Sequence, residues 1–141
     1  MALIRLYMTT SLDGYVTGPQ DILDTPMGIG GFRLFNWLDR RNDPGPSGQV
    51  YAEALATRAV ISGRRTYQHA DRWQGDHHDG VPVFVLTHNV PGDPPPGSVR
   101  YLTDVRECAA QARAASGRCR VPGQAAPSCS VRLAPALYVD S

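Results

Sequence analysis

Two kinds of hydrophobic pattern alternate along this chain and predict its elements. Short apolar runs rich in β-branched and aromatic residues are typical of buried strands, and they occupy residues 2–8, 59–62, 81–87 and 98–102. Between them, apolar residues recur at helical spacing and predict helices over residues 32–38, 49–57, 64–70 and 104–115. Strands that alternate with helices predict an α/β fold with a largely parallel sheet.

The ends and the connections of these elements carry further signals. Asp104 is the expected N-cap of the last helix, which carries Cys108, Ala112 and Ala115 on one face. Residues 13–31 form a long loop with recurring glycine and proline, a type of loop that is usually functional. A break is expected at residues 42–48 and a polar loop around Trp73 at residues 71–80. After residue 117 the sequence has neither helical nor strand periodicity, so no further buried strand is predicted there.

Composition narrows the class of protein. With 141 residues and 42% hydrophobic content, the chain is long enough for one domain with a core and too short for two ordinary ones. The net charge of +1 gives no broad electrostatic case for binding nucleic acid or an anionic membrane. The apolar runs are strand-sized and the first residues lack a signal-peptide segment, so no membrane span and a cytoplasmic location are expected. Three cysteines without a CxxC pair argue against a disulfide framework and a zinc site.

The run Val-Ile-Ser-Gly-Arg-Arg-Thr-Tyr at residues 60–67 has the form of a phosphate-binding site. An apolar strand leads into Gly63, which has no Cβ and lets another molecule approach closely. Arg64, Arg65 and Thr66 then stand at the expected start of a helix, where backbone N–H groups attract anions. This segment predicts an anionic ligand, and the alternative is a solvated first helical turn.

Five segments follow one another in a specific order. They are Ser11-Leu12-Asp13-Gly14-Tyr15-Val16, the stretch from Gly28 to Trp37, Gly63-Arg64-Arg65-Thr66-Tyr67, the lone Trp73, and Val83-Phe84-Val85-Leu86-Thr87-His88. Together they resemble the dihydrofolate reductase-like superfamily, in particular its branch with the reductase domain of the riboflavin-biosynthesis deaminase-reductase. The resemblance covers roughly residues 3–116. It implies a three-layer α/β domain with a mostly parallel sheet flanked by helices, and NADPH across the carboxyl ends of the strands, where such sheets bind ligands.

The resemblance assigns most of the cofactor contacts to the segment from Gly63 to Thr66. Gly63, Arg64 and Thr66 are expected to meet the phosphates through backbone N–H groups, a guanidinium and a hydroxyl, and Arg65 belongs to the same predicted site. Arginine suits phosphate because its planar fork binds two oxygens at once. Thr87 and His88 end a strand where the family holds the adenosine side of the cofactor, and the alternative is an ordinary strand end.

The resemblance places the substrate near the loop after the first strand. Asp13 is the candidate catalytic and substrate-orienting carboxylate, Gly14 supplies the freedom of a closing loop, and Trp37 is a candidate wall of the pocket. A local turn that uses Asp13 for its own backbone is the alternative. The implied reaction is hydride transfer to a pterin- or pyrimidine-like heterocycle, in which the protein aligns two rings and excludes water. Family members often have histidine where this chain has Phe35.

Two histidines raise the question of a metal. His77 and His78 are flanked by acidic residues, but adjacent side chains diverge and no second group of ligands is spaced to complete a tetrahedron. A solvated loop without a metal is therefore expected.

The last quarter of the chain departs from the family pattern. Members of the family continue with a strand, a Gly-Gly turn that takes the cofactor pyrophosphate, and closing strands, whereas this chain has Val-Pro-Gly-Gln at residues 121–124. The reductase domain is thus expected over residues 1–116 and incomplete at its C-terminus, with an irregular tail at residues 117–141. A slip of the coding frame between about Gly117 and Val121 is one interpretation, because shifted codons for residues 122–130 can encode a Gly-Gly motif.

Two functions remain open at this point. The first is an NADPH-dependent reductase that acts on a small heterocycle. The second is a catalytically inactive, truncated remnant that at most binds a nucleotide or a partner. A sheet short of strands exposes an edge and an apolar face, which can lead to aggregation, a swapped homodimer or partial disorder.

Overall fold

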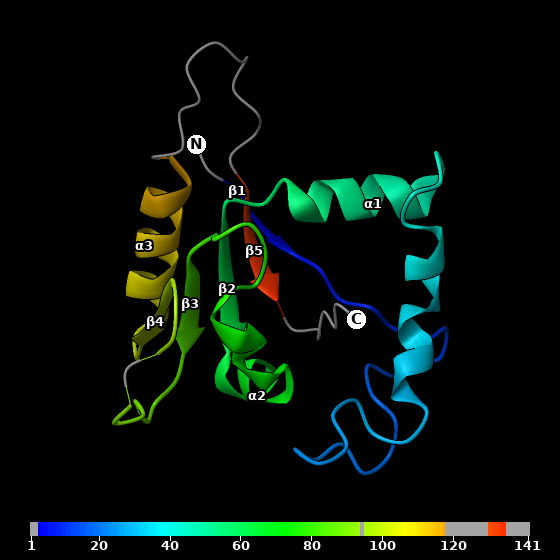
Figure 1. The fold of residues 1–141 in the computed structure, drawn as a ribbon, viewed down its shortest axis with the longest axis horizontal. Coiled ribbons are helices and arrows are strands. Elements are labelled where there is room, and N and C mark those ends of the chain that lie inside the picture. Colours follow the sequence, from blue (N-terminus) through cyan, green and yellow to red (C-terminus); the bar gives the residue numbers. More distant parts are fainter. Residues whose placement is uncertain (1–2, 94, 118–129, 135–141) are drawn as a thin grey trace.

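The computed structural model describes residues 3–93 and 95–117 and the strand at residues 130–134. Its centre is one five-stranded sheet in the order β1-β5-β2-β3-β4 (Figure 1). All four pairs of neighbouring strands are parallel. The strands are β1 (Leu3–Leu6), β2 (Ala59–Gly63), β3 (Val83–Leu86), β4 (Val99–Leu102) and β5 (Ser130–Ala134). The predicted α/β fold with a largely parallel sheet is confirmed.

In the described part of the chain, three α-helices and two 3-10 helices connect the strands. The α-helices are α1 (Pro46–Leu55), α2 (Arg64–His69) and α3 (Val105–Gly117), and the 3-10 helices are η1 (Gly31–Arg40) and η2 (Asp71–Gly75). Helix α1 begins inside the stretch expected to be a break, because Pro46 stands at its first turn, where a missing N–H costs nothing. Among the described residues, no helix is both long and apolar enough to cross a membrane.

Side chains of the strands alternate between two cores, one on each face of the sheet. Val60, Val83 and Val85 pack with Tyr67 of α2 and Trp73 of η2 on one face. On the other face the strand residues Ala59, Ile61 and Phe84 pack with Cys108 and Ala112 of α3. This alternation follows from the period of two along a strand. Helices on both faces give three layers in this part of the molecule.

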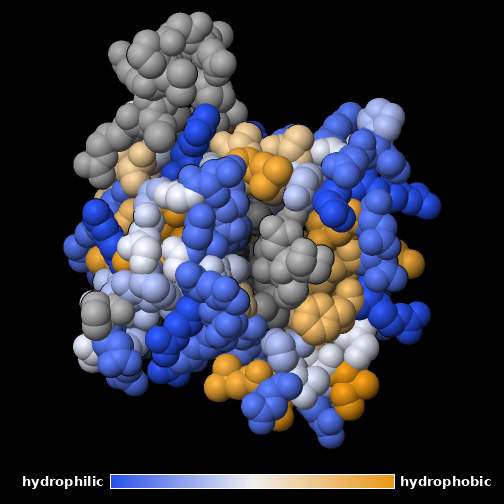
Figure 2. Space-filling model, in the orientation of Figure 1, coloured by the Kyte–Doolittle hydropathy of each residue, from blue (hydrophilic) through white to orange (hydrophobic). Residues whose placement is uncertain are grey.

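The N-terminal region, residues 3–55, lies to one side of the sheet (Figure 1). It joins the sheet through β1, and Arg5 of β1 donates a hydrogen bond of 2.9 Å to Glu53 of α1. Many of its large apolar side chains are exposed, among them Leu6 at 64% and Leu23 at 62%. Figure 2 shows apolar side chains at the surface along the bottom of the view, where the N-terminal loop lies in Figure 1.

Two predictions about the chain path were wrong. The tail was expected to lack a strand, but β5 lies between β1 and β2 and pairs with both. Its place comes from hydrogen bonds on two sides, which local periodicity does not register. The stretch expected to be a polar loop contains η2, in which residues 71–74 have φ between 46° and 55°. This left-handed turn carries Trp73 into the core.

Candidate functional site

The predicted site residues follow the carboxyl ends of three parallel strands. β2 ends at Gly63 and β3 ends at Leu86, and these two residues are paired in the register of the sheet. Arg64 and Thr87 therefore leave the sheet side by side. The loop that carries Asp13 follows β1, whose carboxyl end lies at the same edge because all neighbouring strands are parallel. Ligands of open α/β sheets bind at this edge.

Gly63 and Arg64 present an open surface at the end of β2. Gly63 has ordinary extended angles, φ −74° and ψ 155°, so its backbone does not require glycine. A Cβ built on it meets no atom within 4 Å, which leaves space for another molecule. Arg64, the first residue of α2, is exposed. Within the described part of the chain no hydrogen bond or ion pair engages its guanidinium.

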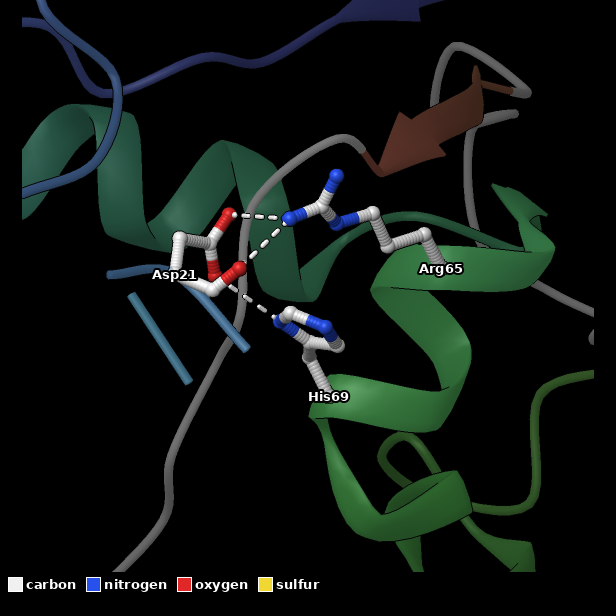
Figure 3. Close-up of polar contacts among 3 residues, drawn as sticks. All are labelled: Asp21, Arg65 and His69. Atoms are coloured by element: carbon white, nitrogen blue, oxygen red, sulfur yellow. Dashed lines mark hydrogen bonds and ion pairs between the residues drawn. The ribbon is translucent and has the colours of Figure 1, made fainter. Parts of the chain in front are cut away.

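Arg65 has a different environment from Arg64. Its Nη2 atom donates to the backbone oxygen of Asp21 at 2.7 Å and to the Asp21 carboxylate at 3.1 Å (Figure 3). Nδ1 of His69 lies 3.0 Å from the other carboxylate oxygen of Asp21. The predicted role of Arg65 in cofactor binding thus competes with a contact that joins α2 to the loop after β1. Sequence reasoning missed Asp21 and His69, because residues 44 and 48 positions apart along the chain carry no local signal.

Thr87, which follows the end of β3, is buried and hydrogen-bonded within its own turn. The Thr87 side chain is 5% exposed, and its hydroxyl donates to the backbone oxygen of Asn89 at 3.0 Å. This geometry supports the ordinary strand end for Thr87, since its hydroxyl already serves a turn. His88 is exposed directly after it. Thr66 is half-buried in α2, and its backbone oxygen accepts from the N–H of Ala70.

Asp13 belongs to a tight turn. Its carboxylate accepts a hydrogen bond of 2.6 Å from the Ser11 hydroxyl. The oxygen of that hydroxyl in turn accepts from the N–H of Tyr15 at 2.9 Å. Gly14 has φ +87°, which a side chain rarely adopts, so glycine is required here by the backbone. The backbone of this turn is thus held by Ser11 and not by Asp13, as the local-turn alternative had it, and the Asp13 carboxylate is exposed.

Asp13 lines a hollow of about 780 Å³. Residues 17–19 and 29–31 of the glycine-rich loop form part of its wall, and Arg33 and Asn36 of η1 also line it. The hollow thus brings a carboxylate, a guanidinium and an amide together. Arg33 and Asn36 were missed from the sequence, although both belong to the segment that resembles the family.

Trp37 is not among the residues that line this hollow, and its place in the wall of a pocket stays a prediction. Its indole Nε1 instead donates to the Thr9 hydroxyl at 3.4 Å. This contact connects η1 to the segment after β1.

His77 and His78 lie beside a second hollow of about 750 Å³. Their Nδ1 atoms are 2.6 Å apart, and the His77 ring meets Trp73 with centroids 4.7 Å apart. One imidazole must donate and the other accept at that distance. Among the described residues, no group of three or more His, Cys, Asp or Glu side chains is arranged to hold a metal ion.

Two buried groups have altered proton affinity. Burial, with a smaller contribution from the neighbouring Tyr101, raises the pKa of Tyr67 to about 12. Burial and then the nearby Glu107 raise the pKa of the Cys108 thiol. Both side chains therefore stay neutral near pH 7, and Cys108 is not an activated nucleophile.

A scan against protein-family models and a search of curated proteins found no match to this sequence. The function proposed below therefore rests on the residues and the geometry of this chain.

Proposed function

We propose that this chain is an NADPH-dependent reductase of the dihydrofolate reductase-like type, with a three-layer fold of that class. In this proposal it transfers a hydride to a pterin- or pyrimidine-like heterocycle, and it works in the cytoplasm on a small molecule. One observation carries the proposal. Gly63-Arg64, Thr87-His88 and the Asp13 loop all follow carboxyl ends of parallel strands at one edge of the sheet.

The residues at this edge fit a dinucleotide in part. Free space around Gly63 and the guanidinium of Arg64, which no described residue engages, suit a phosphate group, which Arg64 would hold bidentately. The buried Thr87 hydroxyl is a poor candidate because Asn89 already accepts its proton. His88, which is exposed, is the better contact for the adenosine end. When bound, NADPH would supply the hydride, and the chain would supply position and exclusion of water.

The hollow beside Asp13 suits the heterocycle. Asp13 can accept from ring or amino N–H groups, while Arg33 attracts an oxygen or an acidic substituent of the same molecule. To receive a substrate, Asp13 must exchange its hydrogen bond with Ser11, which is local and exposed. No general acid is assigned among these residues.

The experiment is a titration of NADPH followed by fluorescence, with the two adjacent arginines compared. Arg64→Ala should weaken NADPH binding by about 1.5–3 kcal/mol, the range for a hydrogen bond to a charged group. Arg65→Ala is the matched control, because its guanidinium is engaged by Asp21, and it should change the dissociation constant much less. Equal dissociation constants for Arg64→Ala and the wild type would refute the phosphate role of Arg64.

The inactive remnant is the second candidate. It is favoured by the exposed apolar side chains of β1, Leu3 at 53% and Leu6 at 64%, which a complete enzyme would be expected to cover. Such a surface also suits a homodimer. Oxidation of NADPH in the presence of a panel of pterins and pyrimidines separates the two: turnover favours the reductase, and cofactor binding without turnover favours the remnant.

A further inference from the structure

We propose that Asp21, Arg65 and His69 form a latch that holds the glycine-rich segment, residues 17–31, against α2. Closed in this way, the latch positions one wall of the hollow around Asp13. The substrate part of this inference rests on the proposed reductase function. The mechanical part does not, and it is tested separately.

The segment itself is a stiff unit. The N–H of Gly18 donates to the oxygen of Met27 at 2.7 Å, and the N–H of Ile29 donates to the oxygen of Pro19 at 2.8 Å. These bonds join two arms of the segment, residues 18–19 and 27–29. The arms are so close that a Cβ on Gly28 would lie 2.3 Å from the oxygen of Gly18. A unit closed by its own backbone moves as one body, so a contact at one point sets the position of the whole segment.

Asp21 supplies that contact. Both oxygens of its carboxylate and its backbone oxygen face α2, where Arg65 and His69 stand one helical turn apart (Figure 3). The Asp21 and His69 side chains are only 19% and 7% exposed. The Oδ1 atom of Asp21 is buried and accepts no hydrogen bond from the described residues, and its contact with Nδ1 of His69 is an ion pair only when that imidazole is protonated. The exposed guanidinium of Arg65 adds a bond to the backbone oxygen, which does not depend on the side chain of residue 21.

The latch connects the two ends of the candidate site. Helix α2 begins at Arg64, the proposed phosphate ligand, and continues to the latch residues Arg65 and His69. The held segment provides residues 17–19 and 29–31 of the wall of the hollow, which Arg33 also lines. Opening of the latch would displace this wall while leaving Arg64 at the end of β2. Asp21 is thus a positioning residue, which acts on the substrate through the segment.

Proteolysis of the native protein tests the mechanical part without any ligand. Ile22 and Leu23, next to Asp21, are 55% and 62% exposed and are thermolysin targets once the segment moves. Asp21→Ala should speed cleavage there by about tenfold, consistent with loss of charged hydrogen bonds. Asp24→Ala removes an exposed carboxylate from the same segment and is the matched control, with no change expected.

Three further variants show whether faster cleavage comes from loss of the Asp21 contacts or from another effect of the substitution. Asp21→Asn preserves shape and one acceptor oxygen and should give an intermediate cleavage rate, whereas Arg65→Ala should accelerate cleavage and Arg64→Ala should not. Circular dichroism and the melting temperature identify any variant that fails to fold. Equal cleavage rates for folded Asp21→Ala, Asp21→Asn and wild type would overturn the latch.

Binding of pterin and NADPH tests the positioning role. Asp21→Ala should weaken pterin binding by about tenfold, with partial recovery in Asp21→Asn, and should leave NADPH binding within about twofold. Equal losses for both ligands would overturn the positioning role. If the wild type binds neither ligand, the reductase proposal fails, and the proteolysis result alone decides whether the latch exists.

Discussion

The sheet half of the molecule, residues 57–117, and the N-terminal region, residues 3–55, are ordered by different interactions. Among the described residues, the buried hydrophobic side chains other than Met27 and Ala54 belong to the sheet half. The exposed large hydrophobic side chains, apart from Val90 and Val105, belong to the N-terminal region. The two regions therefore differ in how much apolar surface each removes from water.

The N-terminal region relies on backbone geometry and polar contacts instead. Its turn at Ser11, the closed segment from Gly18 to Ile29 and the Asp21 latch are all held by hydrogen bonds. Such contacts are individually worth about 1 kcal/mol, whereas apolar burial adds up over area. The sheet half therefore carries most of the stability, and the N-terminal region, on which the candidate substrate hollow is built, is expected to open first.

Two phenylalanines give the largest expected contrast. Phe84 is 1% exposed between α3 and the sheet, while Phe32 of η1 is 46% exposed. Phe84→Ala should lower the free energy of unfolding by about 3–5 kcal/mol, and Phe32→Ala by less than about 1 kcal/mol, because only the first leaves a cavity. Urea unfolding followed by circular dichroism measures both. Similar losses for the two variants would contradict the division into a packed and an open region.

High pH should destabilise the sheet half through Tyr67. Its pKa is raised to about 12 in the folded protein, against about 10 in an unfolded chain. The stabilising effect is complete below pH 10 and is lost as the pH rises to 12, because the unfolded chain releases a proton that the folded protein retains. The loss amounts to about 3 kcal/mol.

Unfolding in urea at pH 9 to 12 measures this slope. Tyr67→Phe should flatten it, since that variant has no phenol to titrate at this position. Tyr15→Phe, which removes an exposed phenol from the N-terminal region, should leave it as in the wild type. An unchanged slope in Tyr67→Phe would show that another group is responsible.

Two glycines with the same backbone angle separate close packing from strain in the N-terminal region. Gly28 and Gly30 have φ +70° and +72°, but only at Gly28 would a Cβ meet other atoms. Gly28→Ala should reduce the local free energy of opening by about 2 kcal/mol, and Gly30→Ala by about 1 kcal/mol. Hydrogen exchange at the Gly18 and Ile29 amides measures the effect, while global unfolding should change less. A larger effect at Gly30 would argue against the close contact between the two arms.

Much of the sheet half was predictable from local pattern. The strands β2 and β3 are continuous buried runs, and the structure shortens the second only from residues 81–87 to Val83–Leu86. Asp104 caps α3 as predicted, since its carboxylate accepts the N–H of Glu107 at 2.8 Å. Cys108, Ala112 and Ala115 face the sheet together, as their helical spacing indicates. These features are local because each depends on neighbours within a turn or a strand.

The candidate site was predictable only in part. The start of α2 at Arg64 and a turn around Asp13 follow from sequence, although Ser11 and not Asp13 binds the backbone of that turn. Trp37 was predicted to line a pocket, and its contact with Thr9 could not be predicted because the two residues are 28 positions apart along the chain. The different environments of Arg64 and Arg65 depend on Asp21. This residue is 44 positions away from Arg65 along the chain, so local sequence gives no sign of the contact.

Local sequence is enough to predict the alternation of strands and helices, the sheet edge at which Gly63 and Arg64 emerge, and the caps and turns next to them. Burial and hydrogen bonding act there between residues that are close along the chain, so the local order of side chains predicts them. Tertiary structure alone decided that β5 lies between β1 and β2, and that Asp21 meets Arg65 and His69. These contacts join segments distant along the chain, and their partners exist only once the sheet has brought them together.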